Sequence, residues 1–202
     1  RGLGDVYKRQ VCGGSGVGKS EIASLLAHYF ENMGVGCYTL SGDNYPYRIP
    51  VYNDAERLRI FRESAIRGMI TDGEYSFERF NIIHQYQLEN KDSEPKNIVK
   101  YPWYESYIRN GAMGLQGYLG TEKEINFFEI QNIVKEFKSG AEKIWLKRMG
   151  REDTELWYEE VDFSEKDILI IEWTHGNSKN YTGVDIPVSV SYTHLRAHET
   201  LA

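Results

Sequence analysis

The order of apolar and polar residues along the chain predicts several amphipathic helices. After Gly18, apolar residues recur at i, i+3, i+4, i+7 and i+8, which predicts a helix that begins at Lys19 and ends near Gly34. The residues on its apolar face are Ile22, Leu25, Leu26, Tyr29 and Phe30.

Three more helices follow from the same spacing. One begins at Asn53, where Asn53 and Glu56 have capping-box spacing and Leu58, Phe61 and Ala65 share a face, and a break at Thr71-Asp72-Gly73 ends it. The next runs from about Ser76 to Leu88 and is followed by a polar linker. The last has Thr121 and Glu124 as a capping box and ends at Gly140, with Phe127, Ile130, Val134 and Phe137 on its apolar face.

Short apolar or alternating stretches predict strands between these helices. Val35–Leu40 and Asp167–Glu172 are expected to be buried strands, and a further strand begins at Val184. Residues 143–148 and 155–160 alternate on either side of a turn, which predicts a hairpin. Its basic residues Lys147, Arg148 and Arg151 would either contact an anionic substrate or form a solvated edge that resists aggregation.

Two segments are predicted to be irregular. Residues 43–50 contain two prolines, each of which disfavours helix at the preceding residue, so an extended loop is expected. Residues 101–120 combine aromatic side chains with four glycines and are interpreted as a loop or lid. Their rings would form a wall for a base or sugar, or would seal a small core.

The sequence Gly13-Gly14-Ser15-Gly16-Val17-Gly18-Lys19-Ser20 matches the phosphate-loop pattern GxxxxGK[ST] at every position. Its glycines let backbone N–H groups surround phosphates without a Cβ in the way. Lys19 would reach the β- and γ-phosphates, Ser20 would ligate Mg²⁺, and the following helix would direct its positive N-terminus at the anion. The motif predicts a site for ATP or another nucleoside triphosphate with Mg²⁺.

An acidic residue lies at the end of each of two predicted strands. Asp43 follows the strand that ends near Leu40, and Glu172 ends the strand Asp167–Glu172. Ligands of parallel α/β sheets bind at the carboxyl ends of the strands, so both acids are expected beside Lys19. Glu172 fits the Walker B position, which supports the metal; otherwise it is simply the first exposed residue after a buried strand.

Composition narrows the partners. A formal net charge of −6 and a pI near 5.5 argue against nucleic acid or an anionic membrane as the main partner. The longest aliphatic run, Ile168–Ile171, is far too short to span a membrane, which predicts a cytoplasmic protein. Cys12 and Cys37 lack metal-ligand spacing and are interpreted as reduced core thiols.

Both ends of the chain differ from the rest. Residues 1–10 are too polar for the central strand expected before the phosphate loop, and together with residues 190–202 they resemble translated sequencing-adapter read-through. We therefore expect a partial domain at residues 11–189, flanked by non-native segments. A real polar strand and a real tail are the alternative.

The order of the motifs along the chain resembles the uridine kinase and phosphoribulokinase family. These motifs are the phosphate loop, the strand before Ser41-Gly42-Asp43, the loop Asn44-Tyr45-Pro46-Tyr47-Arg48, the hairpin and Ile170-Ile171-Glu172. The resemblance implies a three-layer α/β/α P-loop NTPase fold with a mainly parallel sheet, truncated at its C-terminal side. It also implies that Asp43 accepts a proton from the substrate hydroxyl and that Glu172 serves the metal or the substrate. Arg48 and Tyr45 are candidates to contact the acceptor, although Arg48 could equally be a surface arginine.

The implied activity is transfer of a phosphoryl group from ATP to a hydroxyl of a small molecule, such as a nucleoside, sugar or sugar phosphate. Two alternatives remain: a nucleotide-binding regulator or switch, and a folded but inactive kinase fragment. If the lid and later strands of the family are missing here, binding is expected to survive and catalysis to be weak, because water would reach the phosphates.

Overall fold

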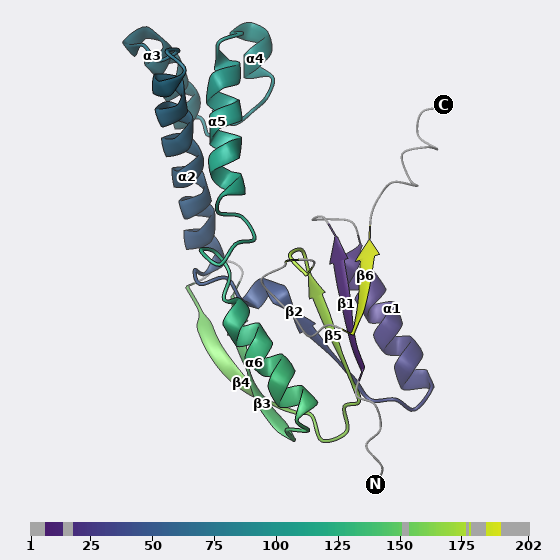
Figure 1. The fold of residues 1–202 in the computed structure, drawn as a ribbon. Helices are drawn as coiled ribbons and strands as arrows, with labels where there is room; N and C mark the ends of the chain where they lie inside the picture. The colour runs from purple at the N-terminus through teal and green to yellow at the C-terminus, as the bar shows by residue number, and fades with distance from the viewer. Residues whose placement is uncertain (1–6, 14–17, 151–153, 177, 179–184, 191–202) are drawn as a thin grey trace, which may run out of the picture. The chain divides into compact units, whose positions relative to one another are not determined.

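The computed structural model describes residues 7–13, 18–150, 154–176, 178 and 185–190. The chain forms two compact units, one built from residues 1–49 and 125–202 and the other from residues 50–124 (Figure 1). The first unit is therefore discontinuous in sequence, and the second is a single excursion of the chain. No helix in the described part of the chain is long and apolar enough to cross a membrane.

The first unit contains a sheet of four parallel strands in the order β2-β5-β1-β6. These strands are β1 (Tyr7–Gly13), β2 (Cys37–Ser41), β5 (Ile168–Trp173) and β6 (Ile186–Val190). Every residue of β5 is buried, as the apolar run predicts for a central parallel strand. The mixed α/β class and the parallel sheet are thus found.

Residues 7–10, which were set aside for their polarity, form the first half of β1. Tyr7 pairs with Ile168 and Gln10 with Ile171. Strand pairing is made by backbone groups, so polar side chains do not prevent it. That residues 1–10 are non-native stays a prediction.

Helices cover both faces of this sheet (Figure 1). On one face α1 (Lys19–Asn32) packs through Ala23 and Phe30 on Ile168 and Ile170. On the other, α6 (Phe127–Lys138) packs on Leu169, Ile171 and Trp173. The alternation of β5 side chains between two cores follows from the period of two in a strand.

The predicted apolar face of α1 is partly wrong. Leu25 and Tyr29 are 63% and 60% exposed, and the packing is made by Ala23 and Phe30 with help from Ile22, Leu26 and Ala27. Small residues such as Ala23 allow the helix to approach the sheet, and the hydrophobic periodicity did not count Ala23 as an apolar position.

The predicted hairpin and the predicted helix before it are confirmed, except at the start of the helix, α6. The hairpin consists of β3 (Lys143–Met149) and β4 (Leu156–Asp162), which pair antiparallel. The four predicted apolar residues of α6 are all buried, and Gly140 has the positive φ of a helix end. The N-cap is Asn126, whose side chain accepts the Glu129 N–H at 3.2 Å, and not Thr121.

The second unit is a group of helices: α2 (Pro50–Thr71), α3 (Phe77–Leu88), α4 (Asn97–Lys100) and α5 (Tyr104–Gln116). α2 begins at Pro50 rather than Asn53, because proline is well suited to the first turn of a helix. The loop predicted at 101–120 is wrong, since α5 occupies most of it. Tyr104 and Tyr107 are buried in the core with Phe61, Ala65 and Met69, which favours the small core over the aromatic wall.

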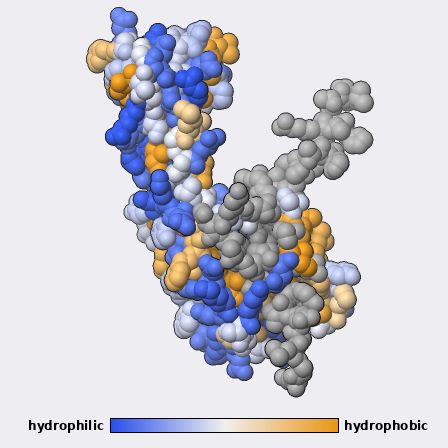
Figure 2. All heavy atoms as spheres, in the orientation of Figure 1, coloured by the Kyte–Doolittle hydropathy of each residue, from blue (hydrophilic) through white to orange (hydrophobic). Residues whose placement is uncertain are grey.

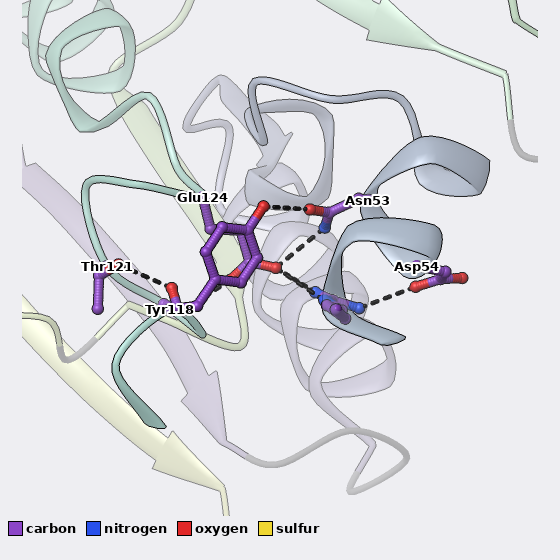
Figure 3. Close-up of polar contacts among 7 residues, drawn as sticks. Asn53, Asp54, Tyr118, Thr121 and Glu124 are labelled. Carbon is purple, nitrogen blue, oxygen red and sulfur yellow. Dashed lines mark hydrogen bonds and ion pairs between the residues drawn. The ribbon is translucent and has the colours of Figure 1, made fainter. Parts of the chain in front are cut away.

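Asn53 and Glu124 join the two ends of this excursion in a buried network (Figure 3). Asn53 donates to Glu124 at 2.9 Å and accepts from the Tyr118 hydroxyl at 3.0 Å. Glu124 also accepts from Arg57 at 2.8 and 2.5 Å and from the Gly120 N–H at 2.6 Å. Neither predicted capping box forms, because both Asn53 and Glu124 are used in this network.

The outer surface of the second unit is mostly hydrophilic along α2, with hydrophobic groups near the ends of α3 and α4 (Figure 2). Phe77, Leu88 and Val99 are 73%, 67% and 88% exposed. Scattered exposure of this kind is common in soluble domains.

Candidate functional site

The N-terminus of α1 presents the described part of the phosphate-loop motif. Gly18 caps the helix in a left-handed conformation, with φ 86° and ψ 26°, and its carbonyl accepts the Ile22 N–H at 3.1 Å. Lys19 is the first helical residue and is buried, whereas Ser20 is exposed. Gly13 is the last residue of β1, and residues 14–17 lie outside the described residues. The helix end is suited to an anion because its first N–H groups lack helical partners.

Asp43 lies just past the end of β2, in a short 3₁₀ helix (Gly42–Asn44). The Tyr45 N–H closes this turn on the Gly42 carbonyl at 3.1 Å. The turn leaves the Asp43 side chain exposed, while Gly42 and Tyr45 are buried. A carboxylate is therefore offered to solvent from a well-anchored turn.

Glu172 is on β5, at the same edge of the sheet. It is opposite Ser41 of β2 and Val11 of β1 in the strand register. Its side chain is buried. The carboxyl ends of all three strands thus meet where the sequence predicts them to meet.

The electrostatics of Glu172 place four predicted residues together. Burial and the neighbouring charge of Asp43 raise the pKa of Glu172, while the Lys19 ammonium and a hydrogen bond from the Ser20 hydroxyl oppose the rise. Lys19, Ser20 and Asp43 therefore each act on Glu172, although the elements that carry them are far apart in sequence. Two carboxylates with a lysine and a hydroxyl form a polar cluster at the carboxyl edge of the sheet.

Gly42 holds the turn of Asp43 against β5. A Cβ at Gly42 would lie 2.0 Å from the ring of Trp173, the residue after Glu172. Only glycine permits this approach of backbone to ring. The sequence alone does not reveal that Trp173 packs on Gly42 and so requires a glycine there.

The hairpin contributes a residue whose placement the sequence analysis did not anticipate. Lys147 is buried, and its ammonium donates to the Pro46 carbonyl at 2.9 Å. It is therefore not part of a solvated edge, nor is it free to meet an anion. Arg148 donates to the Tyr38 hydroxyl at 2.6 Å and to Glu159 at 3.0 Å, and Arg151 lies outside the described residues.

Tyr45 and Arg48, the two residues predicted to contact the acceptor, are both at least half-buried. Tyr45 is fully buried in the core with Phe127 and Trp173, so its ring is not presented to a ligand, which contradicts that hypothesis. Its hydroxyl faces the Lys147 backbone amide, although no partner among the described residues lies within hydrogen-bonding geometry. Burial raises its pKa. Arg48 is half-buried.

The donor set of the cluster suits a hard cation. Among the described residues, no group of three or more His, Cys, Asp or Glu side chains is arranged to hold a metal ion. Mg²⁺, however, is commonly held by one or two carboxylates and by phosphate and water oxygens. Ser20, Glu172 and Asp43 supply oxygen donors and negative charge of that kind.

A shallow, open surface begins at Ser20 and continues along α1. It is lined by Ser20, Glu21, Ser24, Leu25 and His28. The exposed Leu25 side chain, which the helical pattern predicted to be buried, is part of this surface.

Comparison with known proteins finds kinases, while no family model matches the chain. The chain is 39% identical over 178 residues to the bifunctional alpha-galactosidase/sucrose kinase AgaSK of Mediterraneibacter gnavus. The match covers 88% of the chain, which spans only 14% of the length of that relative.

Among solved structures, the fold is similar to a protein named as a fructose transport system kinase from Silicibacter sp. TM1040. The TM-score is 0.51 at 12% identity, and the match covers 93% of this chain and 66% of the other. A similarity at this level of identity concerns the fold alone.

Proposed function

We propose that this chain belongs to a kinase that transfers a phosphoryl group from a nucleoside triphosphate to a hydroxyl of a sugar. The observation that carries the proposal is the cluster of Lys19, Ser20, Asp43 and Glu172 at the carboxyl edge of the parallel sheet. This edge is where ligands of open α/β sheets bind. Phosphoryl transfer needs a group that binds phosphate and a carboxylate close to it, and the start of α1 and Asp43 would supply these.

Asp43 is the proposed general base. Its side chain is exposed and anchored by the turn of residues 42–44. It would orient the acceptor hydroxyl and accept its proton as the oxygen attacks the γ-phosphorus, while the bond from that phosphorus to the β–γ bridging oxygen breaks and the nucleoside diphosphate leaves. A base that is fixed in place contributes mainly by position, which is the larger part of catalysis in this reaction class.

Lys19 is the proposed phosphate-binding residue. Its ammonium would stabilise charge on the transferred group, and the N–H groups at the start of α1 would hold the β-phosphate. The open surface of α1 that begins at Ser20 is the proposed place for the nucleoside. ATP is the proposed donor because the relative similar in sequence is named as a kinase in part and the phosphate-loop motif predicts a nucleoside triphosphate.

Ser20 and Glu172 are the proposed metal ligands. When bound, Mg²⁺ would supply positive charge to the phosphates. Burial, and after it the charge of Asp43, raise the pKa of Glu172. A cation beside both carboxylates would offset the effect of that charge.

The sugar acceptor is proposed from the relative with which the chain shares sequence. The relative that shares sequence is named as a bifunctional alpha-galactosidase/sucrose kinase. This name favours a sugar among the nucleoside, sugar and sugar phosphate acceptors that the resemblance implies. The coarser prediction, a kinase of a small molecule, is supported.

A product assay tests the proposal. The chain is incubated with ATP, Mg²⁺ and a panel of sucrose, fructose, glucose, uridine and ribulose 5-phosphate, and phosphorylated products are identified by mass spectrometry. We expect a phosphorylated sugar with the wild type and its loss in Lys19→Ala, with Lys135→Ala, an exposed lysine of α6, as control. ATP hydrolysis that is independent of every acceptor would favour a switch instead. Phosphorylation of uridine alone would contradict the sugar assignment.

A further inference from the structure

The segment after Asp43 is fixed by hydrogen bonds from two other parts of the chain. The Asn44 side chain accepts the Met149 N–H at 3.2 Å, and the Tyr45 carbonyl accepts the Asn126 N–H at 2.9 Å. Pro46 also forms an isolated antiparallel bridge with Ile125. The turn that carries Asp43 is thus continuous with a segment whose polar groups are bonded on both sides.

Lys147 completes this arrangement from the hairpin. Its ammonium donates to the Pro46 carbonyl at 2.9 Å, three residues from Asp43. The side chain is only 6% exposed. Burying an ammonium is costly unless it is well bonded, so a surface position would be favoured if the hairpin needed only a solvated charge.

A carboxylate near Lys147 favours the charged form of its buried ammonium. Burial lowers its pKa, and the negative charge of Glu129 opposes this shift. Glu129 is itself held by the Asn126 side chain at 3.0 Å and by the Tyr158 hydroxyl at 2.9 Å. The hairpin, the start of α6 and the Asp43 segment therefore meet at Lys147.

We propose that Lys147 is a positioning residue for Asp43, and that the end of β3 clamps the segment Asn44–Pro46 so that the base meets the acceptor hydroxyl in a fixed place. The inference rests on the proposed function, in which Asp43 is the base. Lys147 touches neither nucleotide nor acceptor in this account. It acts through the Pro46 carbonyl, while the Met149 amide acts through Asn44.

A kinetic comparison tests the clamp. In Lys147→Met we expect kcat to fall about 10- to 100-fold, since a displacement of about 1 Å can cost about 100-fold. KM for ATP should stay within about threefold, because the phosphate loop is not altered. Lys143→Met is the matched control: it is on the same strand, exposed and paired with Glu160, and should behave as the wild type.

A double-mutant cycle separates positioning from general damage. In an Asp43→Asn background, Lys147→Met should cause no further loss beyond about twofold, because there is no base left to position. Losses that multiply in the double variant would overturn the proposal. Should Lys147→Met fold poorly, Asn44→Ala removes the other hairpin contact and is expected to give the same pattern.

Hydrogen–deuterium exchange gives a readout that does not require kinase activity. Peptides covering residues 42–47 should exchange faster in Lys147→Met than in Lys143→Met, while peptides of α1 stay unchanged. Equal exchange of residues 42–47 in the two variants would overturn the clamp. Wild-type activity in Asp43→Asn would instead remove the proposed base, and the exchange result would still decide whether the clamp exists.

Discussion

The carboxylate of Glu172 is held in a setting that disfavours its charge. Burial is the main cause of its raised pKa, and Asp43 adds to it, against the opposing effects of Lys19 and Ser20. A carboxyl group whose pKa is higher in the folded than in the unfolded state binds protons more tightly when folded. The free energy of unfolding therefore falls as the pH rises from the unfolded value through the folded value.

Glu172→Gln should for this reason stabilise the ligand-free protein at pH 7.5. The expected gain in Tm is a few degrees, because about 1 kcal/mol corresponds to roughly 2–4 °C in a domain of this size. The gain should shrink at pH 5, where the wild-type carboxyl is more protonated. Thermal scans at both pH values check this, with the exposed Glu142→Gln as control. A Tm difference that does not grow with pH would contradict the raised pKa of Glu172.

At the scale of elements, the helices of residues 50–124 depend on the network around Glu124. Burial alone would raise the pKa of Glu124, but hydrogen bonds from Gly120, Asn53 and Arg57 outweigh burial and the net pKa is lowered. A lowered pKa contributes stability above the unfolded value, and that stability is lost as the pH falls through the folded value. The network joins the start of α2 to the residues that end the excursion (Figure 3).

Glu124→Ala should destabilise the protein by about 3 kcal/mol, near the lower end for breaking a buried ion pair, since Arg57 can turn to solvent. Its side chain is already 37% exposed, whereas that of Glu124 is 0% exposed. Urea denaturation at pH 7 measures the change. Glu63→Ala, which removes exposed pairs with Arg59 and Arg67, is the control and should cost less than about 1 kcal/mol. Equal costs for the two variants would show that the network is not stabilising.

Strong periodic segments predicted elements well, and most of the differences arise from contacts between residues far apart in the sequence or from glycine and proline. The hairpin, β5 and the buried face of α6 followed from their patterns. The aromatic and glycine content of residues 101–120 hid α5, because Gly111 was taken as a sign of a loop. It lies instead in the helix, where a Cβ would approach the ring of Phe61 at 2.5 Å.

At the scale of the whole chain, the sequence predicted where acids and the phosphate motif lie along the chain, and parallel strand order brings them together. The phosphate-loop motif and two strand ends were enough to predict Lys19, Asp43 and Glu172 as site residues. Lys147 could not be found in this way, because its burial depends on a contact with Pro46, 101 residues away. Nor does any local pattern mark residues 50–124 as a separate unit with a core of its own.

The central claim is that Asp43 acts as the base beside a phosphate-binding Lys19. The most direct measurement is the steady-state rate of ADP release in the presence of the accepted sugar, for the wild type, Asp43→Asn and the control Asp54→Asn, whose exposed side chain pairs only with Arg57 among the described contacts. We predict that Asp43→Asn lowers kcat about 100- to 10,000-fold, that Asp54→Asn leaves it within about twofold, and that release by the wild type requires the sugar. A rate for Asp43→Asn within about threefold of the wild type, or release that ignores the sugar, would contradict the account.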